Sequence, residues 1–304
     1  MALLVSVFAG YFALNIHKFR PLLDVKFYFL CAIALGDVIS MFINGLFTKV
    51  ILKPFGKTIS LLESFYVSLV STIGNFFAPV GAGFGFRAVY LKKNHGLPYS
   101  EYISTLSGNY VIVFLVNSLF GLLALFLLRS RADSEYGVLV IAFAVVFVIS
   151  LVLSLVKIPI RASDEQKNRY LGGFIKNLAR VTKGWNHIIS HKKLMIQLVG
   201  LTVLNLVLTM AITWTIIHSL RLGVSFAPLL LFSVLGSLSL FINITPANLG
   251  IKEAIYLFSS SVLGFSVSQI LSIALIDRGV MFSVLLLLWI FSSKMKSKEK
   301  LQAG

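Results

Sequence analysis

Two short stretches of this otherwise apolar sequence combine helix-breaking residues with charged side chains. In the first, NFFAPVGAGFGFRAVY (75–90), a proline and three glycines precede Arg87. Proline removes a backbone donor and glycine weakens a helix by about 1 kcal/mol relative to alanine, so N–H groups lose their helical partners. A helix that restarts after such a break presents free N–H groups and about half a positive charge. Beside an arginine, these groups predict a binding site for an anion such as a phosphate.

The second stretch, NITPANLGIKEAIY (243–256), repeats the order of residues in the first. Each has Asn, then Pro three or four residues later, glycine, a charged side chain and the ending Ala-aliphatic-Tyr. The similarity continues at a constant offset of 168 residues, which pairs Asn109 with Asp277. We therefore predict two repeat units, at about 58–128 and 225–292. The candidate residues are Asn75, Pro79, Gly81, Gly83, Gly85 and Arg87 in the first unit, and Asn243, Pro246, Gly250, Lys252 and Glu253 in the second.

Two alternatives stay open for these stretches. Glycine lets helices approach each other closely, so the glycines alone are also typical of a packing seam. A seam does not account for the charges that follow them. The similarity between the units could also arise by chance, because the identities are few and apolar sequences align easily.

Ionisable residues inside apolar segments extend the candidate site. Asp277 and Arg278 lie near the middle of the last apolar run, and Asp37 lies near the middle of Phe27–Ile51. A charge at the centre of a bilayer costs roughly a few kcal/mol or more, so we expect these side chains to face the protein interior. Adjacent residues point about 100° apart on a helix, so Asp277 and Arg278 need partners elsewhere. We expect Asp37, Glu253 and Asp277 to pair with the arginines or to carry a proton, with a purely structural ion network as the alternative.

The composition indicates a membrane protein. Of 304 residues, 58% are hydrophobic and only 12% are charged, which is too little polar surface for a soluble protein of this size. Runs that approach or exceed the ~20 residues of a membrane-spanning helix occur at 110–128, 138–156, 194–217 and 266–291. Lipid offers no partner to exposed backbone groups, and long unalternating runs exclude a β-barrel. We predict an all-α, polytopic helix bundle that forms one integral membrane domain over 1–304, with a short first helix at 1–16.

The distribution of charge predicts the orientation. The net charge is +16, and nine of the 27 Lys and Arg residues lie in the loop 157–193. Because basic loops stay in the cytoplasm, we place this loop and the lysine-rich C-terminus there. We expect the protein itself to be a multi-pass protein of the cytoplasmic membrane of a prokaryote. The broken stretches would then have opposite orientations: 245–264 crosses, and 61–86 either approaches from the opposite side or forms a re-entrant hairpin. Basic residues that lie between apolar runs do not indicate a nucleic-acid partner.

The segment at about 158–192 is predicted to be an amphipathic cytoplasmic helix. Its apolar residues recur every three or four positions, and Lys176, Arg180 and Lys183 are available to anionic lipid headgroups. A basic connector that docks on the bundle is the alternative.

The usual catalytic motifs of soluble enzymes are missing from the sequence. His187 and His191 are four residues apart but have no acidic partners, and GAGFG (81–85) lacks the spacing of a dinucleotide-binding motif. Neither a nucleophile motif nor a cysteine-histidine site occurs. We therefore expect no enzymatic activity, no metal and no cofactor.

The two stretches resemble the lysylphosphatidylglycerol synthase transmembrane-region family, a flippase-like domain. The patterns N-x3-P-x-G-x-G…R-A at 75–88 and P-x3-G-x2-E-A at 246–254, followed by Asp277 and Arg278, carry the resemblance, which covers roughly Phe27 to Phe291. It implies a bundle of about eight spans that binds or moves lipid headgroups or polyprenyl-phosphate-linked intermediates.

On the matched positions, the resemblance implies that Arg87, Glu253 and Arg278 line a central cavity. Phe84 and Gly85 stand where the family often has an acidic residue before the arginine. The charge balance of the first stretch therefore departs from the family pattern.

These features together predict a stand-alone flippase-like transporter, without the aminoacyl-transferase domain of some family members. The expected partners are membrane lipids, either an anionic phospholipid or a polyprenyl phosphate. The expected mechanism is alternating access around a midplane site, where arginines and broken-helix N–H groups hold the phosphate. The alternative is a non-transporting subunit or scaffold of a lipid or cell-surface glycan biosynthesis enzyme. Such enzymes, or a second copy of the chain, are further possible partners.

Overall fold

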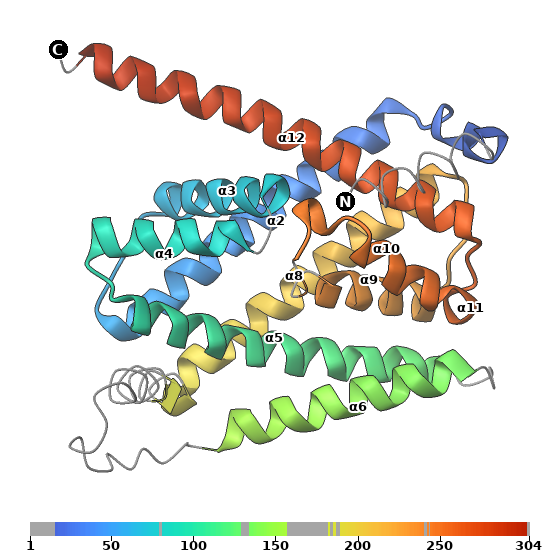
Figure 1. The fold of residues 1–304 in the computed structure, drawn as a ribbon, viewed down its shortest axis with the longest axis horizontal. Helices are drawn as coiled ribbons and strands as arrows, with labels where there is room; N and C mark the ends of the chain where they lie inside the picture. The colour runs from blue at the N-terminus through green and yellow to red at the C-terminus, as the bar shows by residue number, and fades with distance from the viewer. Residues whose placement is uncertain are drawn as a thin grey trace.

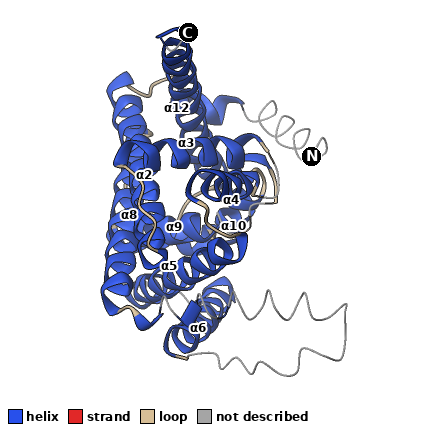
Figure 2. Cartoon of the chain, turned by 90° about the vertical axis from the view of Figure 1, so that its left-hand side faces the viewer, coloured by secondary structure: helices blue, strands red, loops and turns tan. Residues whose placement is uncertain are grey.

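The computed structural model describes residues 16–78, 81–128, 134–156, 182, 185–186, 189–239, 242 and 244–302. These residues form helices and short connections, and no strand occurs among them (Figure 2). The predicted all-α class is therefore confirmed. The first helix predicted at 1–16 and the amphipathic segment predicted at 158–192 lie largely outside the described residues.

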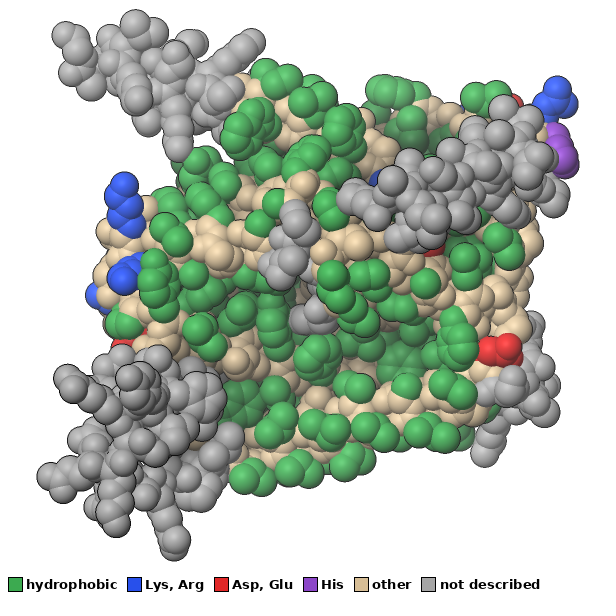
Figure 3. All heavy atoms as spheres, in the orientation of Figure 1, with side chains coloured by type: hydrophobic (Ala, Val, Ile, Leu, Met, Phe, Trp, Pro, Cys, Tyr) green, Lys and Arg blue, Asp and Glu red, His purple; other side chains and the backbone are tan. Residues whose placement is uncertain are grey.

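Five helices of the described part are long and apolar enough to cross a membrane. They are α2 (Phe27–Leu52), α5 (Tyr99–Leu127), α6 (Ser134–Leu155), α8 (Lys192–Ser219) and α12 (Val267–Gln302). They contain the apolar runs found in the sequence, and apolar side chains cover much of the face shown in Figure 3. On α6, for example, Ile141, Val145 and Val148 are exposed. Such a surface suits lipid rather than water, as expected for a multi-pass membrane protein.

The five long helices alternate in direction across the bundle. In Figure 1, α2, α6 and α12 end toward the side at which α5 and α8 begin. We call this side, where the C-terminus lies, the C side, and the opposite one the N side. Short 3-10 helices flank α2: η1 (Ile16–Leu22) precedes it and η2 (Lys53–Phe55) follows it.

The first broken segment is a helical hairpin, formed by α3 (Leu61–Phe77) and α4 (Ala82–His95). Near its tip the Asn75 side chain contacts the Gly83 backbone, and at its open end Glu63 contacts His95. Because α2 ends and α5 begins at the C side, the hairpin enters from the C side and returns to it (Figure 1). The segment 61–86 therefore has the hairpin form of the re-entrant alternative and does not approach from the opposite side, while its depth in the membrane stays a prediction.

The second broken segment is also a hairpin, formed by α9 (Phe226–Ser239), η3 (Pro246–Asn248), α10 (Ile251–Phe258) and α11 (Ser260–Leu263). Asn248 bonds back to Ser239, and Phe265 packs edge-on against Phe232, so the chain reverses after α9. It enters from the N side, where α8 ends and α12 begins. The predicted crossing at 245–264 is wrong, because the eight residues of α10 span only about 12 Å of a ~30 Å core.

The two hairpins meet inside the bundle with their tips toward each other. Helix α3 contacts η3, and the rings of Phe76 and Phe77 at the first tip contact Phe282 on α12. Each hairpin restarts after a left-handed glycine, Gly81 (φ 66°) or Gly250 (φ 85°). Left-handed backbone is open to glycine at little cost, so these glycines set the turns. The expected count of about eight spans stays a prediction.

The hairpins differ in depth. Every residue of α9 from Leu229 to Gly236 is buried, and this helix lies in the main apolar core. In α4, only Gly83 and Leu91 are buried. The second hairpin is thus central, whereas the first is peripheral.

Candidate functional site

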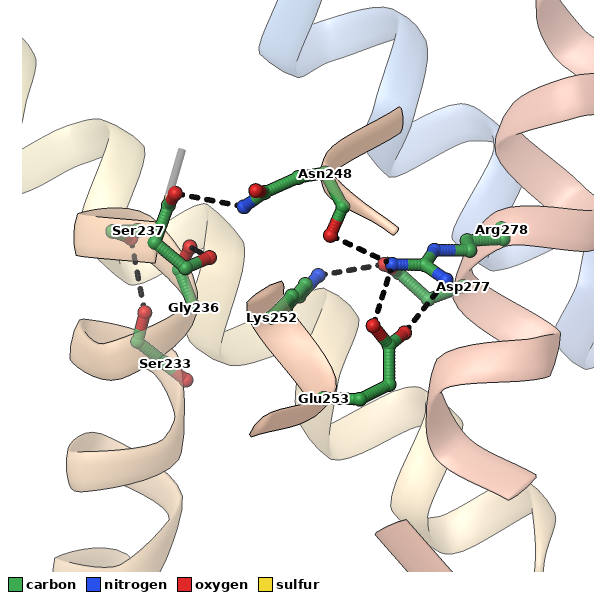
Figure 4. A network of polar contacts seen from close by, with 9 residues as sticks. Ser233, Gly236, Ser237, Asn248, Lys252, Glu253, Asp277 and Arg278 are labelled. Atoms are coloured by element: carbon green, nitrogen blue, oxygen red, sulfur yellow. Dashed lines mark hydrogen bonds and ion pairs between the residues drawn. The ribbon is translucent and has the colours of Figure 1, made fainter. Parts of the chain in front are cut away.

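Two ion pairs join the second hairpin to α12. Lys252 Nζ donates to Asp277 Oδ2 at 2.7 Å, and Arg278 Nη1 lies 2.7 Å from Glu253 Oε1. Arg278 Nη2 also donates to Glu253 Oε2 at 2.9 Å, so this pair is a two-point fork (Figure 4). Asp277 and Arg278 therefore have the separate partners that their spacing on a helix requires.

The start of α10 explains how Glu253 is held. Gly250 takes a left-handed conformation that places its N–H toward the side chain three residues later. Glu253 Oε2 accepts this N–H at 2.9 Å. The same carboxylate, only 2% exposed, thus caps α10 and neutralises Arg278.

Asn248 forms two hydrogen bonds that hold the tip of the second hairpin. Its Nδ2 donates to the carbonyl of Ser239 at 2.7 Å, and its own carbonyl accepts from Arg278 Nη2 at 3.2 Å. Asparagine tolerates the left-handed φ of 54° found here better than most residues. Pro246 begins η3 just before it, while the predicted Asn243 lies outside the described residues.

The first hairpin holds its arginine differently. Arg87 Nε donates to Ser71 Oγ at 3.3 Å, from α4 to α3. The three ion pairs among described residues are those of Glu63, Glu253 and Asp277, so within this part of the chain Arg87 has no carboxylate partner. The Arg87 side chain is half-buried between these two helices.

Two tyrosines of α5 face Arg87. Tyr102 and Tyr110 are both close enough to interact electrostatically with the guanidinium. Tyr102 is 3% exposed, and its hydroxyl has no hydrogen-bond partner among the described residues. Neither Ser71 nor Tyr102 was expected from the sequence, because nothing in the spacing of residues shows that α5 packs here.

The glycines of the first hairpin have separate roles. A Cβ at Gly83 would overlap with the carbonyl oxygen of Ser71, so the packing-seam alternative is right for this residue. Gly81 provides the left-handed turn. Gly85 has no atom near its Cβ position and is exposed, so neither role applies to it. Pro79 lies outside the described residues.

The two restarting helices do not offer all of the free N–H groups that the sequence predicted. The Gly83 N–H donates to Asn75 Oδ1 at 2.9 Å, and the Gly250 N–H donates to Glu253. Asn75 is therefore a helix cap, and these two N–H groups are not open to a phosphate. This correction leaves the arginine side chains as the candidate groups for binding an anion.

Asp37 interacts with charged residues at the second hairpin and on α12. It lies on α2, is 3% exposed, and interacts electrostatically with Asp277 and Lys252. Its Oδ2 atom is buried, and no described residue forms a hydrogen bond with it.

The described contacts of Arg87 and Arg278 do not overlap. Arg278 is tied to Glu253 and the tip of the second hairpin, while Arg87 contacts Ser71. Among the described residues, no contact joins the two arginines at a common site. The second hairpin has an ion network, and the first has an arginine without a carboxylate partner among these residues.

Comparison with known proteins identifies the family of this chain. Neither a curated protein nor a solved structure matches this sequence. The model of the lysylphosphatidylglycerol synthase TM region family matches residues 1–288, nearly the whole chain. With its apolar spanning helices and paired hairpins, the chain therefore belongs to the lysylphosphatidylglycerol synthase TM region family.

Proposed function

We propose that the protein is a flippase-like transporter that binds an anionic lipid by its phosphate group at Arg87. The observation that carries the proposal is the lack of a carboxylate partner for Arg87 among the described residues. An ionised group in a membrane protein is costly unless it is paired or functional. A lipid phosphate would supply the missing charge through two parallel hydrogen bonds to the guanidinium.

The surroundings of Arg87 support a lipid as the ligand. The free hydroxyl of Tyr102 is a further donor for a phosphate oxygen. The exposed Gly85 and Val89 lie two positions from Arg87 on either side, so they mark the face of α4 that points away from the arginine and from its contact with α3. The apolar tail of a lipid would stay in the membrane while its headgroup reaches the arginine. Both an anionic phospholipid and a polyprenyl-phosphate-linked intermediate have this chemistry.

The opposed hairpins support transport rather than binding alone. They enter from opposite sides and restart after left-handed glycines, as the units 58–128 and 225–292 of an inverted repeat would. Inverted repeats with broken helices provide alternating access by moving one unit against the other. We infer that the peripheral first hairpin carries the headgroup, and that the central second hairpin moves against α12.

The test is headgroup accessibility in proteoliposomes made with purified protein and fluorescent phospholipids or polyprenyl phosphates. We expect protein-dependent movement of a lipid phosphate, loss of that movement in Arg87→Gln, and retention in Lys93→Gln. Lys93 is an exposed cation on the same helix, so this variant controls for the loss of charge alone.

Two results would contradict the proposal. Movement by Arg87→Gln at the wild-type rate would remove Arg87 from the site. No movement of any lipid by folded wild-type protein would favour the other candidate role, a subunit or scaffold that does not transport.

A further inference from the structure

The charged cluster at the second hairpin has one more carboxylate than cations. Among the described residues, the cations that interact with Asp37, Glu253 and Asp277 are Lys252 and Arg278. With all five ionised, the cluster carries three negative and two positive charges, a net −1. Each cation is already 2.7 Å from a carboxylate oxygen of Glu253 or Asp277. Asp37 is left without a cation of its own.

The position of Asp37 makes this excess charge costly. The residue lies near the middle of a membrane-spanning helix and is 3% exposed. Within the part of the chain that the structure describes, its Oδ2 atom has no hydrogen-bond partner. A buried carboxylate that is neither paired nor hydrogen-bonded costs several kcal/mol, which one proton on the carboxylate removes.

A proton fits this position better than a metal ion. Among the described residues, no group of three or more His, Cys, Asp or Glu side chains is placed to hold a metal. Binding a proton requires only one free carboxylate oxygen, which Asp37 provides.

We propose that Asp37 is a proton-binding site that couples movement of the second hairpin to the proton gradient. This proposal rests on the proposed transport function. One O–H bond forms when the carboxylate takes up a proton and the same bond breaks on release, with no other bond changed. While Asp37 is protonated, Lys252 pairs with Asp277, as in the structure. When Asp37 releases its proton, its carboxylate competes for Lys252 and weakens the contact of α10 with α12.

The groups that face Asp37 come from two elements. Asp277 on α12 and Lys252 on α10 interact with it electrostatically. The elements that pack against α2 are α3, α5, α8, α12 and η2. Besides Asp37, α2 itself has the titratable side chains Tyr28, Cys31 and Lys49. The elements packed against it add Lys53 on η2, Glu63 and Tyr66 on α3, Tyr99, Glu101, Tyr102 and Tyr110 on α5, Lys192, Lys193 and His218 on α8, and Arg278 on α12.

The first test is infrared difference spectroscopy of the purified protein in lipid as the pH is changed. We expect a protonated-carboxyl band that is absent in Asp37→Asn and shifted in Asp37→Glu, which keeps a carboxyl group. Asp24→Asn, at an exposed carboxylate before α2, should keep the band. The same band in Asp37→Asn as in wild type would overturn the proposal.

The second test is lipid movement in proteoliposomes under an imposed pH difference. With one proton per lipid, one pH unit supports about a tenfold ratio of lipid between the leaflets. We expect this response in wild type and in Asp24→Asn, and its loss in Asp37→Asn, which should still equilibrate lipid. If the wild-type protein moves lipid but the ratio between the leaflets does not depend on the pH difference, the coupling is overturned and the transport function stands. Wild-type protein that moves no lipid would overturn the transport function and with it the coupling, while the infrared band would still decide whether Asp37 binds a proton.

Discussion

The two hairpins share a local plan but treat their arginines in opposite ways. In each, a helix enters the bundle, breaks, and restarts after a left-handed glycine, Gly81 or Gly250. In the central hairpin, Glu253 and Asp277 neutralise both cations. In the peripheral hairpin, Arg87 has a serine hydroxyl and no described carboxylate. A repeated backbone motif therefore does not imply a repeated binding site.

Both arginines are half-buried, so the difference lies in the residues around them. Glu253 is 2% exposed, so it needs a partner that replaces water. Arg87 lies on a helix with few buried residues, and it contacts a serine hydroxyl instead of a carboxylate. The deep copy suits a structural hinge, and the shallow copy suits exchange of a ligand.

The largest expected effect is a difference in stability between the variants of the two arginines. Arg278→Gln leaves Glu253 buried without its cation and should reduce the free energy of unfolding by about 3–5 kcal/mol. Arg87→Gln loses one long hydrogen bond and should cost less than about 1 kcal/mol. Thermal unfolding in detergent measures both.

A double variant sharpens this result. Arg278→Gln combined with Glu253→Gln removes both charges and should recover much of the lost stability. Equal destabilisation by Arg87→Gln and Arg278→Gln would show that the hairpins do not differ in this way.

A second effect compares two glycines on one helix. Gly83→Ala would push the new Cβ into the Ser71 carbonyl and separate α3 from α4, at a cost of about 1–3 kcal/mol. Gly85→Ala meets no atom and should be neutral, or stabilising by up to about 1 kcal/mol through helix propensity. Unfolding of the two variants under the same conditions is the measurement, and similar losses of stability would argue against close packing at Gly83.

A third, smaller effect concerns the cap of the first hairpin. Asn75→Ala removes the acceptor of the Gly83 N–H and should cost about 1 kcal/mol. Asn75→Asp keeps an acceptor and should retain most of the stability. If Asn75→Ala unfolds at the wild-type temperature, the contact does not stabilise the hairpin.

The smallest effect is a pH dependence at the open end of the first hairpin, outside the membrane-spanning helices. Burial alone would raise the pKa of Glu63, but hydrogen bonds with His95 and Tyr90 outweigh it and hold the pKa below its ordinary value of 4.5. The carboxylate therefore stabilises the fold above that value, and the contribution disappears as the pH falls through the lowered pKa.

The measurement for Glu63 is the difference in unfolding temperature between wild type and Glu63→Gln. It should correspond to less than about 1 kcal/mol near neutral pH, because the pair is partly exposed, and should vanish in acid. A difference that grows in acid would contradict the assignment.

The sequence predicted the long helices well because lipid makes length and hydropathy decisive. The runs inside α5, α6, α8 and α12 can only be helices. The hairpins were harder, since two half-length helices that reverse have the same hydropathy as one crossing helix. The reversal at 239–248 is visible only through tertiary contacts, such as that of Asn248 with Ser239.

The candidate site was predicted in part. Position in an apolar run indicated that Asp277 and Arg278 need partners, and Glu253 was expected to pair with an arginine, as it does. The pairing of Asp277 with Lys252 was not predicted. At the first stretch, the resemblance indicated only that Phe84 and Gly85 alter the charge balance before Arg87. It did not predict that Arg87 lacks a carboxylate partner among the described residues. Residues brought in by packing, such as Tyr102, had no such signal.

The most direct test of the account is binding of a short-chain lipid phosphate, farnesyl phosphate, to purified protein by calorimetry, with farnesol as the uncharged control. We predict that wild type and the Arg278→Gln, Glu253→Gln double variant bind the phosphate and not the alcohol. Arg87→Gln should bind about 10- to 100-fold more weakly, as expected for loss of a charged hydrogen-bonding partner. Wild-type affinity in Arg87→Gln, with loss of binding in the double variant, would place the anion at the second hairpin and contradict the account.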